Sequence, residues 1–232
     1  MQNLHPQGLW SNFYDLTQIP RPSGQKEEIS AFLANYGHSL GLETIVDSIG
    51  NVIIRKPASP GYENHPGVIL QGHMDMVPQK NNDTKFDFAK DPIEAYIDGE
   101  WVTAKGTTLG ADNGIGVAAA MAILADQSLV HPPLEVLVTV DEETGMYGAF
   151  ALEGGLLQGK TLLNLDSEAE GELYVGCAGG VDTTAKFAYT PVEVEEGDVA
   201  VKVSVTGCKG GHSGCDIHLQ RANANKLLFR FL

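Results

Sequence analysis

A histidine and an aspartate, His73 and Asp75, stand two residues apart directly after the apolar run at residues 68–70. One imidazole nitrogen can bind a divalent metal, and a nearby carboxylate can accept the other ring N–H and fix the tautomer. The apolar run has no polar alternation, which is typical of a strand buried in a parallel sheet. We therefore expect His73 at the carboxyl end of that strand, the edge at which open α/β sheets bind ligands.

Acidic side chains occupy equivalent places farther along the chain. Glu142 and Glu143 follow the strand predicted for residues 134–140, and Asp166 follows the one predicted for residues 161–165. Asp112 lies in a glycine-rich turn that leads into a small apolar helix. That turn lacks the Gly-Lys-Ser/Thr of a phosphate loop, and its carboxylate would repel phosphate. Because the carboxyl ends of parallel strands share one edge, we expect these acids to lie near His73.

One imidazole with several carboxylates and no thiolate suits zinc, with manganese or cobalt as alternatives. The acids outnumber the ligands that one ion needs, whereas two ions about 3.5–4 Å apart would use them all and activate water. Asp112 is placed to bridge the two ions. Neighbours such as Glu142 and Glu143 point in different directions, so one can bind metal while the other acts as a general base. Each acidic turn taken alone is equally typical of a solvated loop.

Composition narrows the function classes. The chain has 232 residues and a net charge of −15, which argues against nucleic acid and anionic membranes as partners. No stretch approaches the roughly 18 apolar residues of a membrane span, and the first residues do not resemble a secretory leader, so we expect a cytoplasmic protein. The cysteines Cys177, Cys208 and Cys215 show no C-x-x-C spacing, which argues against a disulfide framework or a thiolate zinc site.

The elements that must position these residues indicate an α/β fold: a mainly parallel sheet flanked by helices, over residues 1–182. Helices are predicted at residues 9–19 and from an N-cap at Ser23 to Gly37, and hairpins at residues 43–54 and 93–104. From residue 183 to 232 the pattern of apolar and polar residues changes. Alternation at residues 199–205 predicts an antiparallel, half-exposed sheet, and a helix follows from residue 217. We interpret this second part as the beginning of an α+β lid domain, incomplete because the sequence stops inside that helix.

Five segments together resemble, in order and spacing, the co-catalytic zinc peptidases of the aminoacylase and carboxypeptidase type: residues 71–75, 110–114, 141–145, 164–168 and 210–214. Residues 77–84, 106–116 and 176–180 are similar to a narrower group, the cytosolic aminoacyl-histidine dipeptidases. The resemblance implies zinc-dependent hydrolysis of small peptides, with a preference for Xaa-His dipeptides such as carnosine.

The resemblance also implies a role for each residue. His73 would bind one zinc, with Asp75 orienting its ring. Asp112 would bridge both metals, and a cis peptide often follows this residue in the family. Glu142 matches the general base, Glu143 a ligand of one metal, and Asp166 a ligand of the other. His212 matches a lid-domain histidine that, in dimeric relatives, reaches into the partner's site to help hold the substrate, so a homodimer is expected.

The chain departs from the family in length. Members are about twice as long and supply a last histidine ligand after the lid, a role that no residue fills here. We therefore expect a fragment whose independent activity is open. The alternatives are a tripeptidase or an N-acyl amino acid deacylase of the same family, or an inactive fragment that acts only as a metal-binding or dimerisation module.

Overall fold

The strands that carry the expected site residues lie at one side of a five-stranded sheet with the order β1-β2-β6-β3-β7. The computed structural model describes residues 1–232 except 2, 168, 178, 180, 182 and 212–215. Strand β3 (Val68–His73) lies between β6 (Leu134–Thr139) and β7 (Thr161–Asn164) and is parallel to both. The carboxyl ends of the three strands therefore face the same edge, as predicted.

The sheet as a whole is mixed. Strands β1 (Glu43–Val46) and β2 (Val52–Lys56) form the predicted hairpin, and β2 pairs antiparallel with β6. The parallel prediction thus holds for β6, β3 and β7, the strands that carry the site. The second predicted hairpin is also present: β4 (Ala95–Asp98) and β5 (Trp101–Ala104) form a separate two-stranded sheet.

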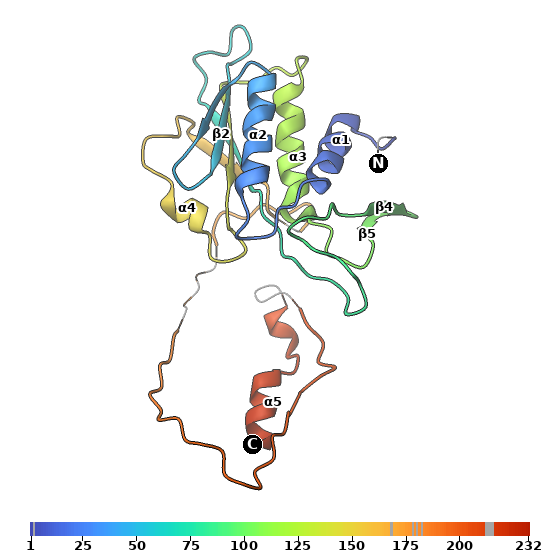
Figure 1. Ribbon diagram of the computed structural model, residues 1–232. Coiled ribbons are helices and arrows are strands. Elements are labelled where there is room, and N and C mark those ends of the chain that lie inside the picture. The colour runs from blue at the N-terminus through green and yellow to red at the C-terminus, as the bar shows by residue number, and fades with distance from the viewer. Residues whose placement is uncertain (2, 168, 178, 180, 182, 212–215) are drawn as a thin grey trace. The chain divides into compact units, whose positions relative to one another are not determined.

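Three helices cover one face of the sheet: α1 (Gln7–Thr17), α2 (Glu27–Ser39) and α3 (Ala111–Ala125) (Figure 1). Helix α2 packs on β1 and β2, and α3 contacts both β3 and α1. Because α3 has neighbours on two sides, its Val117, Ala118, Met121 and Leu124 are all buried. This apolar helix anchors the glycine-rich turn that precedes it.

The opposite face holds a smaller apolar cluster. Ile53, Ile69 and Leu137 are buried there, because alternate side chains of a strand point to opposite faces. Leu152 and the partly buried residues near it cover them, after the short helix α4 (Tyr147–Ala151) that follows β6. All four residues of β7 are exposed, so this strand is the least covered part of the sheet.

One sequence prediction about the helices is wrong. We expected Ser23 to cap the second helix, but α2 begins at Glu27 and its N-cap residue is Lys26, without a side-chain cap. Two acids in the first turn, Glu27 and Glu28, complement the helix dipole instead. The hydroxyl of Ser23 donates to Oδ2 of Asp75 at 2.7 Å, because the buried carboxylate is a strong charged acceptor.

The chain divides into two units, Met1–Gly176 and Cys177–Leu232. The second contains a 3₁₀ turn, η1 (Ile217–Leu219), and helix α5 (Ala224–Phe231), whose first turn is capped by the Asn223 side chain accepting from the Lys226 N–H at 3.0 Å. The helix predicted from residue 217 is interrupted at Gln220, which has a φ of 52°.

The strand predicted at residues 199–205 is not formed: no described residue of this segment pairs in a ladder. The alternation of apolar and polar residues indicates which side chains would lie on the same face of a strand. A strand also needs a neighbouring strand with which its backbone can form hydrogen bonds. The domain boundary near residue 182 stays a prediction.

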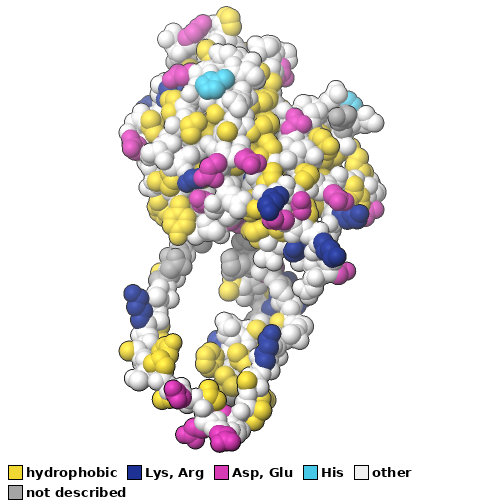
Figure 2. Space-filling view, viewed as in Figure 1, with side chains coloured by type: hydrophobic (Ala, Val, Ile, Leu, Met, Phe, Trp, Pro, Cys, Tyr) yellow, Lys and Arg dark blue, Asp and Glu magenta, His cyan; other side chains and the backbone are white. Residues whose placement is uncertain are grey.

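Charge is spread over the surface. Acidic side chains are interspersed with Lys and Arg over the face of the chain that Figure 2 shows. Among the described residues, no helix is long and apolar enough to cross a bilayer.

Candidate metal centre

His73 is the last residue of β3, and its side chain is only 1% exposed. Its Nε2 lies 3.0 Å from Oδ1 of Asp112 and 3.6 Å from Oδ1 of Asp166. Its Nδ1 lies 3.1 Å from the backbone oxygen of Asp75 and 3.4 Å from Oδ1 of the same residue. One ring nitrogen is thus held by residue 75, and the other is directed toward two carboxylates.

Asp112 is presented by the turn at the start of α3. The backbone leaves helical geometry at Asp112 and Asn113, and the peptide bond between them is cis, as the resemblance implied. The side chain of Asn113 donates to the backbone oxygen of Leu165 at 2.8 Å. Asn113 therefore ties the turn of Asp112 to the residue that precedes Asp166.

Glu142 and Glu143 are positioned by two aspartates. Asp141 has a φ of 52°, and its Oδ1 accepts from the Gly24 N–H at 2.6 Å. The carboxylate of Asp75 accepts from the backbone N–H of Glu142 at 3.0 Å and of Glu143 at 3.3 Å. Asp75 thus does more than orient His73, because it also holds the acidic turn that follows β6.

The donor atoms form two overlapping groups. One contains His73, Asp112 and Glu143, the other His73, Glu142 and Asp166, and the donor atoms in each lie within 4.8 Å of one another. Imidazole nitrogen and carboxylate oxygen are ligands suited to zinc and manganese, so the residues present fit a divalent metal. All five were predicted from sequence, and the fold brings all five together.

The charges at the centre shift each other's pKa. Burial favours neutral His73, but the carboxylates of Asp112, Asp166 and Asp75 outweigh it and raise the pKa of the imidazole to about 12. Burial and the neighbouring Asp112 raise the pKa of Glu143 to about 7. Burial also raises the pKa of Glu142, with His73 opposing. A cluster that holds protons this tightly favours any cation placed among its carboxylates.

Asp75 shows the opposite shift. Burial alone would raise its pKa, but hydrogen bonds from His73, from the Ser23 hydroxyl and from the Glu142 N–H lower it to about 2. Asp75 is therefore ionised at neutral pH, and its carboxylate oxygens act as the acceptors of these hydrogen bonds.

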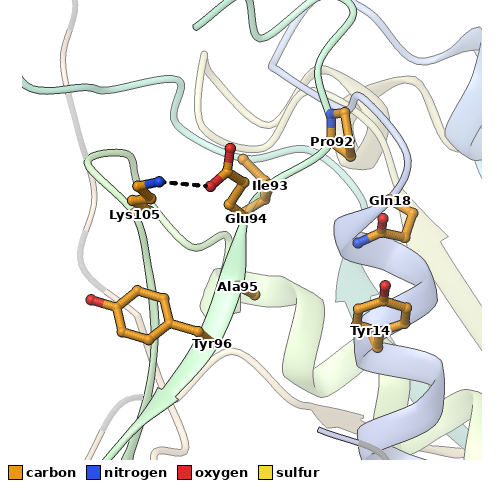
Figure 3. A pocket seen from close by; sticks show the side chains of 8 residues that line it. All are labelled: Tyr14, Gln18, Pro92, Ile93, Glu94, Ala95, Tyr96 and Lys105. Carbon is orange, nitrogen blue, oxygen red and sulfur yellow. Dashed lines mark ion pairs between the residues drawn. The ribbon is translucent and has the colours of Figure 1, made fainter. Parts of the chain in front are cut away.

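The cavities of the first unit differ in whether residues of the candidate centre line them. One of about 630 Å³ opens between α1 and the hairpin of β4 and β5, with the Glu94–Lys105 ion pair beside it, and none of the four candidate ligands nor Glu142 lines it (Figure 3). A smaller one of about 240 Å³ adjoins the centre: Glu142 and Asp166 line it together with apolar side chains that include Met146 and Leu152. The smaller cavity is the one beside the candidate centre.

Sequence reasoning missed some residues and named one that cannot be placed. Ser23, which the sequence predicts as an N-cap, and Arg21, which no sequence pattern singles out, both contact the segments of the centre. A lone arginine between Pro20 and Pro22, far from any strand end, offers no periodic signal. His212 lies outside the residues that the structure describes.

Comparisons with known proteins place this geometry in a family. The family model described as peptidase family M20/M25/M40 matches residues 69–221. The cytosol non-specific dipeptidase of Escherichia coli K12 is 53% identical over 232 residues, which are 100% of this chain and 48% of that protein. The chain thus spans about half the length of this curated relative.

Solved structures agree. The aminoacylhistidine dipeptidase of Vibrio alginolyticus is 50% identical, with a TM-score of 0.76 over 100% of this chain and 47% of that one. A tripeptidase from Staphylococcus aureus is 25% identical, with a TM-score of 0.61 over 72% of this chain and 44% of that one. With the family model matching well over half of its residues, the chain belongs to peptidase family M20/M25/M40.

Proposed function

We propose that this chain carries the metal ligands and the general base of a zinc-dependent dipeptidase that acts on Xaa-His dipeptides such as carnosine. The observation that carries the proposal is the convergence of His73 and four carboxylates in two groups of donor atoms at one sheet edge. The names of the E. coli and Vibrio relatives support the dipeptide substrate, and the former supports a cytosolic location.

His73, Asp112, Glu143 and Asp166 are the side chains that would hold two zinc ions. When bound, such ions make water more acidic and polarise a peptide carbonyl. Glu142 is the proposed general base. Its carboxylate would take a proton from the attacking water and pass it to the leaving amine. Burial raises the pKa of Glu142, which makes its carboxylate a stronger base than an ordinary glutamate and suits it to this exchange.

The raised pKa of Glu143 makes the two acids hard to tell apart by electrostatics alone, so the assignment of the base rests on placement. Glu142 lines the 240 Å³ cavity that adjoins the centre, where a substrate side chain could lie. Glu143 groups with His73 and Asp112, and Glu142 with His73 and Asp166, but only Glu142 of the two acids lines this cavity. We propose His212 as a residue that holds the substrate carbonyl or carboxylate across a homodimer.

The experiment is the Glu142→Gln variant in the zinc-loaded protein. We expect turnover of carnosine to fall by about 10²–10⁴-fold, the usual contribution of a general base, while the zinc content measured by elemental analysis stays that of the parent. Glu153→Gln is a matched control, because Glu153 is exposed and outside both donor groups. A Glu142→Gln protein that kept the parent's rate would show that the base is assigned wrongly.

A substrate panel tests the rest of the proposal. Carnosine, tripeptides and N-acetyl amino acids are to be compared on the same metal-loaded preparation, with zinc, manganese and cobalt in turn. Faster cleavage of tripeptides or N-acetyl amino acids would replace the dipeptidase assignment with a tripeptidase or a deacylase. Metal binding without any cleavage would instead support a non-catalytic metal-binding module.

A further inference from the structure

Arg21 is a buried arginine that joins two segments of the candidate centre. The residue is only 2% exposed and follows α1. Its Nη1 donates to the backbone oxygen of Met74 at 3.0 Å, and its Nη2 donates to the backbone oxygen of Gly110 at 2.5 Å. Met74 lies between His73 and Asp75, and Gly110 begins the turn of Asp112. One planar guanidinium therefore spans the exit of β3 and the start of α3.

Two glycines of the turn make room for this guanidinium. A Cβ on Gly110 would lie 2.5 Å from Nη2 of Arg21, and a Cβ on Gly114 would lie 2.6 Å from the same atom. Gly110 also has a φ of +72°, which favours glycine in any case. At Gly114 no such backbone reason exists, and a Cβ there would be crowded by the guanidinium of Arg21 and, at 3.1 Å, by Cε2 of Phe13. Arg21 thus lies directly against the turn that presents Asp112.

The charge of Arg21 matters as well as its shape. Burial lowers the pKa of the guanidinium to about 10, against the influence of Asp75 and Asp112, so the group stays charged at neutral pH. A fixed cation beside two carboxylates reduces their mutual repulsion. The planar fork holds its donor nitrogens at a fixed separation, so Nη1 and Nη2 reach two different segments, a geometry that the single nitrogen of an ammonium group does not reproduce.

We propose that Arg21 is a positioning residue that sets the placement of the Asp112 carboxylate against His73. This inference rests on the proposed function, since it treats both residues as metal ligands. A merely structural arginine would stabilise the fold without affecting how the centre binds metal. If Arg21 is a positioning residue, its replacement must change both the geometry of the turn and the affinity of the centre for metal.

The test compares Arg21→Lys with Arg55→Lys. Arg55 is a matched control, because its side chain is only 16% exposed in the same unit and makes ion pairs with Glu43 and Glu135 and a hydrogen bond to the Leu156 backbone. None of those partners is a candidate ligand. Amide hydrogen exchange on the metal-free protein reports the turn at residues 110–114 and the segment at residues 74–76. Zinc titration calorimetry then reports affinity.

For Arg21→Lys we expect faster exchange in both segments and at least a tenfold loss of zinc affinity, and for Arg55→Lys neither change. Exchange and affinity equal to those of the parent would overturn the proposal. Should the variant not fold, Gly114→Ala replaces it: its Cβ displaces the guanidinium without removing the charge, and parental zinc affinity in that variant would also overturn the proposal. A parent that binds no zinc would refute the proposed function, while the metal-free exchange data still decide the role of Arg21.

Discussion

Replacing Asp75 tests how one buried carboxylate holds several parts of the centre. Asp75 is 4% exposed and accepts hydrogen bonds from the Ser23 hydroxyl at 2.7 Å and from the backbone N–H groups of Glu142 and Glu143 at 3.0 and 3.3 Å. Asp75→Ala would leave these three donors without an acceptor. Asp75→Asn would keep one oxygen but lose the charge and introduce an NH₂ group that faces other donors.

The size of the effect follows from those bonds. Each buried donor left unpaired costs about 1–3 kcal/mol, and solvent that enters the space left by the alanine recovers part of this. We therefore expect the free energy of unfolding to fall by about 3–5 kcal/mol in Asp75→Ala and by about 1–3 kcal/mol in Asp75→Asn. Because Asp75 also contacts Nδ1 of His73, we expect zinc affinity in Asp75→Asn to fall by about 10–100-fold.

The assay is urea unfolding of the metal-free chain, followed by tryptophan fluorescence. Trp10 and Trp101 both lie in the first unit, and Trp101 is 77% exposed, so the change in signal comes mainly from Trp10, whose ring packs edge-on against buried Phe13. Zinc calorimetry on the folded variants completes the measurement.

Asp47→Asn is the matched control. Asp47 also accepts from three backbone N–H groups, those of Ile49, Gly50 and Asn51, and it lies in the β1–β2 turn, where its hydrogen bonds reach none of the candidate ligands directly. We expect this variant to lose stability and to keep the parent's zinc affinity. If Asp75→Asn unfolded at the parent's urea concentration, or bound zinc as Asp47→Asn does, the reasoning about Asp75 would be refuted.

Two further predictions concern the framework behind the centre. Tyr36 donates its hydroxyl to the Met121 backbone oxygen at 2.9 Å, and burial raises the pKa of this hydroxyl; Tyr36→Phe should lower the free energy of unfolding by about 1 kcal/mol. The raised pKa means that the fold favours the protonated hydroxyl of Tyr36. The stability difference between the parent and Tyr36→Phe should therefore be full below about pH 10 and disappear at higher pH. A difference in urea midpoint that does not change with pH would contradict this. Lys56 donates to the backbone oxygens of Ile123 at 3.0 Å and Asp126 at 2.5 Å, at the end of α3. Lys56→Met should lower the free energy of unfolding by about 1–3 kcal/mol, measured by the same assay. An unchanged urea midpoint would show that the hydrogen bonds of Lys56 to the end of α3 do not stabilise the fold.

The candidate centre could be predicted largely because its residues follow recognisable strands. The apolar runs before His73, Glu142 and Asp166 indicated parallel strands, and the observed register confirms the pairing: His73 pairs with Thr139, and Gln71 pairs with Asn164. The burial expected of such strands is found in β3 and β6 but not in β7, whose four residues are all exposed. Parallel strands that are adjacent must end at one edge, so the convergence followed from pattern and topology rules alone. The resemblance to the family added the roles, which the proposed experiments test.

The supporting contacts could not be predicted in the same way. Ser23 had the local signature of an N-cap, but its hydroxyl bonds to Asp75, which is distant in sequence. Arg21 had no signature at all, although it contacts two segments of the centre. A local pattern records what each residue prefers in its own segment, whereas these bonds depend on which distant acceptor the folded chain brings near.

The sequence by itself therefore determined the chemistry of the centre and the edge at which it lies. Residue type decides which atoms can bind a metal, and the period of the apolar runs decides where strands end. Only the tertiary structure decided that β3 lies between β6 and β7, that Asp75 holds the turn of Glu142 and Glu143, and that Arg21 lies against the turn of Asp112. Those choices follow from packing and from pairing buried polar groups across the whole domain, and no single segment of the sequence contains them.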